Sequence, residues 1–168
     1  MYLHAPEAED LERTWKWHND PELYKTLLGT FHYVSRATEE DWLGKKLIYS
    51  PQELNLAICL RSDSQHIGNV YLRSIDWFAR HGEVELFLGE VVHRSKGYGQ
   101  AAMRLLVKYA FHDLGLVRLY SPILEDNEPS IRMFEKCGFV LEGKLRKHAF
   151  KDGRLKDVLV MGLVAENA

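Results

Sequence analysis

The sequence contains little cysteine, no long hydrophobic segment and almost no net charge. Its two cysteines, Cys59 and Cys137, are too few and too far apart for a disulfide framework or a zinc site. No apolar run approaches the ~20 residues of a membrane-spanning helix, and the first residues lack the pattern of a secretion signal. A net charge of -2 provides no general attraction to nucleic acid. We therefore expect a cytoplasmic protein that holds no metal and contacts neither membrane nor nucleic acid.

The composition that is present indicates one globular domain. The chain has 168 residues, of which 46% are hydrophobic and 27% charged, as in ordinary soluble domains. No internal repeat and no Pro/Gly/Ser-rich linker divides it. We therefore expect a single domain over residues 1–168.

Hydrophobic periodicity predicts a helical first third and a strand-rich remainder. Helices are expected over 7–18 and 21–28, with a third that is capped by Thr38 and ends near Tyr49, and 30–35 is a loop or a short strand. Further on we expect strands over 54–60, 66–72, 83–88, 117–123, 139–150 and 155–164, and helices over 101–111 and from Asn127 to Cys137. Antiparallel ends joined by one strand–helix–strand crossover predict a mixed α/β (α+β) sheet with helices on both faces.

The segment Arg-Ser-Lys-Gly-Tyr-Gly-Gln, from Arg94 to Gln100, joins a predicted strand to a predicted helix. Backbone N–H groups and the positive end of the helix dipole suit such a turn for a phosphate, and Arg94 and Lys96 add positive charge. A plain tight turn is the alternative. The turn lacks the third glycine of the dinucleotide fingerprint and the Gly-Lys-Ser/Thr of a Walker loop, so neither of those nucleotide sites is indicated.

Two segments resemble the signatures of the GNAT N-acetyltransferase superfamily. Arg94-x-x-Gly97-x-Gly99 is similar to the motif that binds the pyrophosphate of acetyl-CoA, and Asn127 to Phe139 resembles the second signature. The stretches 17–21 and 141–158 resemble the RimJ/RimL-like branch, so the resemblance covers about residues 2–164.

The resemblance implies a mostly antiparallel sheet of six to seven strands whose splayed central strands hold CoA. It implies that Leu88 or a neighbour supplies a backbone N–H to the thioester oxygen and that Asn127 contacts the cofactor arm, unless Asn127 is only a turn residue. Ser95 stands where relatives commonly have glycine. The implied cofactor-binding residues are Leu88, Arg94, Ser95, Lys96, Gly97, Tyr98, Gly99, Gln100, Asn127 and Ser130.

The implied reaction is direct attack of a primary amine on the thioester of acetyl-CoA. The amine is mostly protonated at neutral pH, and removing its proton costs about 4 kcal/mol. Glu85, and then Glu83, are the expected bases because they lie two apart on one strand face, with a solvent-facing strand edge as the alternative. Phe134 stands where many relatives have a tyrosine acid. Ser130 is the implied replacement, with a helix N-cap as its alternative role.

The acceptor is expected against the N-terminal half, with His32, Asp76 and Trp77 as binding residues. The Asp76 carboxylate would attract an ammonium group by its charge, and the ring face of the neighbouring Trp77 by a cation–π interaction. Members of the branch acetylate ribosomal protein N-termini, and relatives act on polyamines, antibiotics and nucleotide-linked amino sugars, so the acceptor stays open. A homodimer is the assembly that relatives suggest. Two other classes also stay open: a catalytically weak acyl-CoA-binding module, and a phosphate-binding domain unrelated to CoA.

Overall fold

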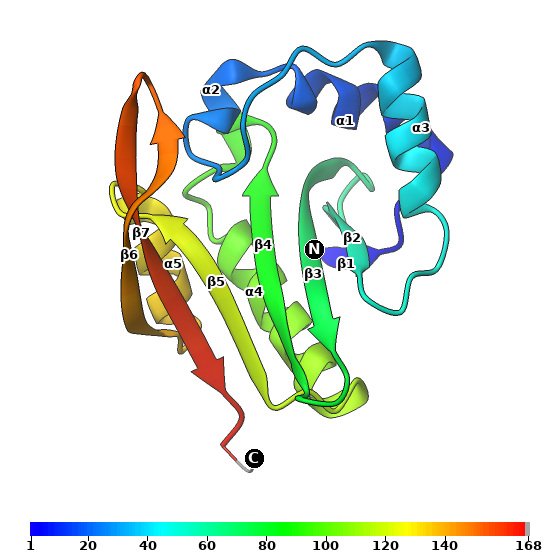
Figure 1. The fold of residues 1–168 in the computed structure, drawn as a ribbon. Coiled ribbons are helices and arrows are strands. Elements are labelled where there is room, and N and C mark those ends of the chain that lie inside the picture. Colours follow the sequence, from blue (N-terminus) through cyan, green and yellow to red (C-terminus); the bar gives the residue numbers. More distant parts are fainter. Residues whose placement is uncertain (167–168) are drawn as a thin grey trace.

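The computed structural model describes residues 1–166 and contains one seven-stranded sheet (Figure 1). The strand order is β1-β2-β3-β4-β5-β7-β6, and all neighbours are antiparallel except β4 and β5. This confirms the predicted mixed, mostly antiparallel sheet of six to seven strands. The strands are β1 Tyr2–His4, β2 Leu54–Cys59, β3 His66–Asp76, β4 His81–Leu88, β5 Arg118–Leu124, β6 Val140–Lys151 and β7 Arg154–Val164.

Helices lie on both faces of the sheet, as predicted. In Figure 1, α1 to α3 lie across the upper end and α4 and α5 lie behind the sheet. No helix in residues 1–166 is long and apolar enough to cross a bilayer. The helical segments are η1 Ala8–Asp10, α1 Leu11–His18, α2 Pro21–Tyr24, α3 Arg36–Lys46, η2 Val91–His93, α4 Tyr98–Lys108, η3 Tyr109–Asp113 and α5 Glu128–Lys136.

Element boundaries differ from the sequence predictions mainly in the first third of the chain. The prediction that Thr38 caps α3 was wrong, because the Ser35 hydroxyl accepts a hydrogen bond from the Thr38 amide at 3.2 Å and α3 begins at Arg36. The second helix ends at Tyr24 instead of Leu28, and 30–35 is a loop. Strand β1 was missed because three residues are too few to show an alternation.

Strand β4 lies between two apolar clusters, one on each face of the sheet. Its two glutamates lie on the same one of these faces. Val84, Leu86 and Leu88 pack with α4 in the main core, where a fully buried aliphatic side chain contributes about 1.5–3 kcal/mol. Phe87 faces the other way and packs with Trp17, Leu23 and Tyr71 beneath α1 and α2. Because side chains alternate along a strand, Glu83 and Glu85 lie on the Phe87 face.

Strands β4 and β5 diverge soon after they meet. They pair in parallel only at His81 with Arg118, Gly82 with Leu119 and Glu83 with Tyr120. From there β5 continues to pair with β7 up to Leu124, whereas β4 runs on to Leu88 without a partner on that side. The predicted splay of the central strands is therefore present, and its apex lies at Glu83.

Candidate active site

The glycine turn gives α4 an open, positively polarised start. Gly97 is its N-cap with a φ of 83°, a left-handed conformation that glycine adopts without a steric penalty. The first hydrogen bond of the helix runs from the Ala101 amide to the Gly97 carbonyl at 3.0 Å. The amides of residues 98–100 precede it and have no partner within the helix. This arrangement fits the pyrophosphate of CoA, since N–H groups at a helix start bind anions.

The side chain of Arg94 is fixed to the end of β4. Its Nε donates to the Leu88 carbonyl at 3.2 Å and its Nη2 to the Gly89 carbonyl at 3.4 Å. Lys96 is exposed beside it and makes no such contact with the strand. The Arg94 guanidinium is thus held at the turn by these two hydrogen bonds. The exposed Lys96 side chain can adjust its position to contact a ligand.

The backbone of Leu88 faces the gap between β4 and β5. The next amide, of Gly89, donates across to the Ile67 carbonyl of β3 at 3.0 Å. Successive residues of a strand direct their N–H groups to opposite sides, so the N–H groups of Leu88 and Leu86 point away from β3. This edge supplies the kind of backbone donor that stabilises negative charge developing on a carbonyl oxygen.

Asn127 and Ser130 lie at the start of α5, and the structure gives them different tasks. The Asn127 Oδ1 accepts from the Ser130 amide at 3.3 Å, so Asn127 is the N-cap. The alternative reading of Ser130 as the cap was therefore wrong, and its half-buried hydroxyl is not used for capping. Phe134 is 2% exposed and packs edge-to-face on Phe139 with ring centroids 4.9 Å apart, so this position supplies packing and no proton.

The two glutamates of β4 differ in their surroundings. Glu85 forms an ion pair with Arg73 at 3.2 Å, and its side chain is 44% exposed. Glu83 is half-buried at the apex of the splay, opposite Tyr120. Burial raises the pKa of Glu83 above its ordinary value, and the neighbouring carboxylate of Glu85 raises that pKa further.

Two of the predicted acceptor residues lie far from the glycine turn, at the end of β4 that also carries Glu83. Asp76 and Trp77 form the turn between β3 and β4, whereas the glycine turn follows the opposite end of β4. A strand of 8 residues separates the two turns by roughly 24 Å at about 3.4 Å per residue. The Asp76 carboxylate accepts hydrogen bonds from the backbone amides of Phe78 and Ala79, at 2.9 and 2.8 Å. His32 is exposed in the loop that precedes α3.

Sequence reasoning missed a buried, hydrogen-bonded His–Glu pair between α1 and α3. Glu39 of α3 is 0% exposed, and its Oε2 accepts from His18 Nδ1 at 2.7 Å. A signal was available, because Glu39 lies four residues before the buried Leu43 and so on the inner face of the helix. An acidic residue at such a position is rarely buried without a purpose.

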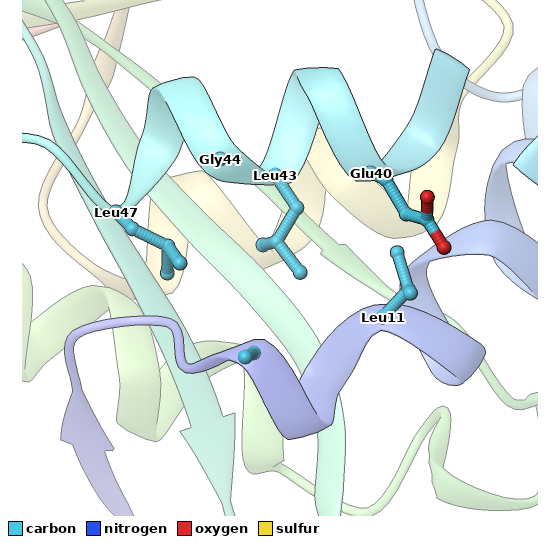
Figure 2. Close-up of a pocket in the computed structure, with 6 residues that line it drawn as sticks. Leu11, Glu40, Leu43, Gly44 and Leu47 are labelled. Atoms are coloured by element: carbon cyan, nitrogen blue, oxygen red, sulfur yellow. The ribbon is translucent and has the colours of Figure 1, made fainter. Parts of the chain in front are cut away.

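Two cavities lie away from the glycine turn. A pocket of about 130 Å³ between α1 and α3 is lined by Ala8, Leu11, Glu40, Leu43, Gly44 and Leu47 (Figure 2). A groove of about 370 Å³ lies between the β1–β2 edge and α4, lined by Tyr2, Leu3, Leu54, Leu56, Arg61, Leu105 and Tyr109. Neither contains a residue that the sequence predicted for the site.

The splay and the adjoining anion site are features of one class of acyltransferases, and the comparisons agree. Residues 1–140 match the acetyltransferase (GNAT) domain. The chain therefore belongs to the GNAT acetyltransferase family, whose acyl donor is acetyl-CoA.

The individual relatives share only limited sequence identity with this chain. The uncharacterized N-acetyltransferase p20 of Bacillus licheniformis is 29% identical over 98% of this chain and 92% of its own. The spermidine N(1)-acetyltransferase of Vibrio cholerae is 32% identical, but over 55% of this chain and about half (53%) of its own. A crystal structure of Vibrio cholerae spermidine N-acetyltransferase with CoA and spermine superposes with a TM-score of 0.89 at 24% identity, covering 97% of this chain and 94% of that one. At this identity the superposition shows a shared fold.

Proposed function

We propose that the protein transfers the acetyl group of acetyl-CoA to a primary amine, in the gap between β4 and β5, by direct attack of the amine on the thioester. One observation carries this proposal: the gap has a carboxyl group of raised pKa, Glu83, at its apex and the outward-facing N–H groups of Leu86 and Leu88 along its open edge. A base for the ammonium proton and donors for the carbonyl oxygen are the two groups that this reaction needs.

The remaining roles follow from position. The amides of residues 98–100 and the side chain of Lys96 hold the pyrophosphate, and the unpaired edge of β4 receives the pantetheine arm. Asn127 contacts that arm. Ser130 protonates the departing thiolate, which leaves readily even with little help because a thiol has a pKa of about 8.5. Glu83 is a better base than Glu85, whose carboxylate is already engaged by Arg73.

The acceptor is a small-molecule amine or a protein N-terminus, as in the RimJ/RimL-like branch, and polyamines are the first class to test. The partial match to a spermidine acetyltransferase supports that choice. Antibiotics and nucleotide-linked amino sugars are the other small acceptors. A homodimer stays a prediction. A module that binds acyl-CoA without catalysis is the second candidate, because Phe134 removes the usual acid.

Calorimetry with CoA and acetyl-CoA, followed by a thiol-release assay, tests the proposal. We expect binding of both, and release of free thiol with acetyl-CoA only when an acceptor amine is added. The acceptor panel contains spermidine, putrescine, peptides with free N-termini and amino sugars. Absence of binding at millimolar concentration would exclude both candidates, whereas binding without thiol release across the panel would favour the binding module.

A further inference from the structure

Several buried polar atoms without a hydrogen-bond partner belong to the α1–α3 side of the sheet. Within residues 1–166 they include Oε1 of Glu39, Oδ1 of Asn55 and the hydroxyl of Tyr71. Buried polar atoms are nearly always paired, because an unpaired one loses its hydration without compensation. The Nε of Arg73, on the same face of β3, is also without a hydrogen-bond partner. These atoms are therefore open to a bound water or to a ligand that supplies the missing partners.

Glu39 is held so that one oxygen stays free. Its Oε2 accepts from His18 Nδ1 at 2.7 Å, and the Trp42 ring packs edge-on against the His18 ring with centroids 4.5 Å apart. These contacts fix the carboxylate from the α1 side. The second oxygen, Oε1, is buried and has no protein donor.

A row of side chains on the sheet continues this polar surface toward the proposed reaction centre. The register places Asn55 opposite Tyr71, and Tyr71 opposite Glu85, so the three side chains share one face of β2, β3 and β4. This is the face that carries Glu83. Tyr71 is 4% exposed, and the Arg73 guanidinium lies 4.6 Å from the centre of its ring.

Tyr24 connects Glu39 with this row. Burial raises the pKa of the Tyr24 phenol, the carboxylate of Glu39 raises that pKa further, and the Arg73 guanidinium lowers it. Tyr24 also acts on Tyr71, whose pKa is raised chiefly by burial. Tyr24 is thus within electrostatic reach of α3 on one side and of β3 on the other.

We propose that Glu39, Asn55 and Tyr71 bind the distal ammonium group of a diamine or polyamine acceptor while its reacting amine lies at Glu83. This inference rests on the proposed acetyl transfer. Oε1 of Glu39 and Oδ1 of Asn55 are both acceptors, so the missing partner must be a donor. A charged ammonium satisfies them best, because it donates up to three hydrogen bonds and complements the carboxylate.

The charges on this face also discriminate against other acceptors. Glu83 and Glu85 lie on this face of β4, where Arg73 is already paired with Glu85, and the buried Glu39 of α3 is paired with His18. The phosphates of a nucleotide-linked sugar would meet these carboxylates and be repelled. A monoamine would leave Oε1 of Glu39 without a partner. It would therefore bind less tightly than a diamine that has the same reacting amine and also a distal ammonium group.

Two conservative substitutions test the proposal. Glu39→Gln removes the charge, and Tyr71→Phe removes only the unpartnered hydroxyl. For each we expect KM for spermidine and putrescine to rise about tenfold or more, as loss of a charge-assisted hydrogen bond predicts. The value of kcat/KM for propylamine should change less than about twofold, because a monoamine does not reach these groups. Calorimetry should give unchanged CoA affinity.

The control is Glu40→Gln, which alters the next residue of α3, an exposed glutamate that is paired with Arg36 and lines the pocket between α1 and α3. It should leave both acceptors unaffected. Melting temperatures separate binding from folding: Tyr71→Phe should melt at or above the wild-type temperature, because a buried hydroxyl without a partner is removed. A purely structural role would lower the melting temperature and impair diamine and monoamine equally.

The outcomes distinguish this inference from the proposed function. Equal effects on diamines and monoamines, or no effect of either substitution, would overturn the inference while acetyl transfer by the wild type stands. Wild-type transfer to peptides or amino sugars but not to diamines would overturn it as well. No transfer to any amine, with CoA still bound, would overturn the proposed function and this inference together.

Discussion

Asn127 donates its side-chain amide to the carbonyl oxygen of Thr26 at 2.9 Å and so joins the start of α5 to the segment that follows α2. Lys151, at the end of β6, makes a second connection, donating to the carbonyls of Tyr24, at 3.0 Å, and Gly29. The segment between α2 and α3 is thereby held against the C-terminal half. Asn127 is also the residue that the family resemblance assigns to the cofactor arm, so we expect one side chain to serve both the loop and the cofactor site.

The two functions of Asn127 separate in two variants. Asn127→Asp keeps the oxygen that caps α5 but loses the amide donor, whereas Asn127→Ala loses both. We expect the alanine variant to lose about 1 kcal/mol of folding free energy, and the aspartate variant clearly less. Both should bind CoA more weakly. Denaturant unfolding and calorimetry measure the two effects.

Asp20 provides the matched control, because it caps α2 by accepting from the Glu22 amide at 2.9 Å. Asp20→Ala should cost a similar free energy of unfolding and leave the CoA affinity unchanged. Equal CoA affinity of Asn127→Asp and the wild type would remove Asn127 from the cofactor site.

Gly97 should be required for the shape of the anion site. A Cβ at Gly97 meets no atom within 4 Å, but the residue has a φ of 83°. Gly97→Ala therefore costs about 1–2 kcal/mol through its backbone alone and tilts the first amides of α4 away from the pyrophosphate. We expect lower stability together with CoA binding weakened about tenfold or more, as misdirected charge-assisted hydrogen bonds predict.

Gly153 in the β6–β7 turn has the same backbone requirement, with a φ of 74° and nothing within 4 Å of its Cβ position. Gly153→Ala should lose comparable stability with no change in CoA affinity. If both variants bind CoA alike, Gly97 has no special role in the anion site.

The pH dependence should identify Glu83 as the base. Its pKa is raised above the ordinary 4.5, so the ionised side chain is disfavoured in the folded protein. The stability that Glu83 contributes is present below its unfolded pKa and is lost as pH rises through the folded pKa. Glu83→Gln should therefore melt at pH 7 at or above the wild-type temperature. Its acetyl transfer should fall about 10²–10⁴-fold and no longer rise with pH through the range in which Glu83 titrates.

Glu85→Gln is the comparison, because it changes the neighbouring carboxylate that is paired with Arg73. It should retain the rise of rate with pH. A pH profile that is lost in Glu85→Gln and kept in Glu83→Gln would reverse the assignment.

Ser130 should affect the chemistry more than cofactor binding. Since Asn127 caps α5, Ser130→Ala removes a hydroxyl that the helix does not need for capping. We expect an unchanged melting temperature, a smaller loss of CoA affinity than of rate, and single-turnover acetyl transfer slowed about 10–100-fold, the lower part of the range for a general acid. An unchanged single-turnover rate would exclude Ser130 as the acid.

Much of the architecture followed from local patterns. The turns at 61–65 and 151–154, the glycine after α5 and the strand–helix–strand crossover are all encoded by neighbouring residues, and the structure confirms them. Helix starts were less predictable, because Ser35 and Thr38 are both good caps and only backbone geometry selects Ser35. The three-residue β1 forms because β2 offers it an edge.

The sequence by itself determined that a glycine turn joins a strand to a helix, since the Arg94–Gln100 motif and the periodicities around it are local, and that motif predicts a phosphate site. Tertiary structure alone decided which side chains meet at the reaction centre. The register of β3, β4 and β5 places the apex of the splay at Glu83, pairs Glu85 with Arg73 and sets Asp76 opposite His81, at the end of β4 away from the glycine turn. The packing of α3 over α1 buries Glu39 against His18. Such contacts depend on strand register and helix packing between distant segments, which no local pattern specifies.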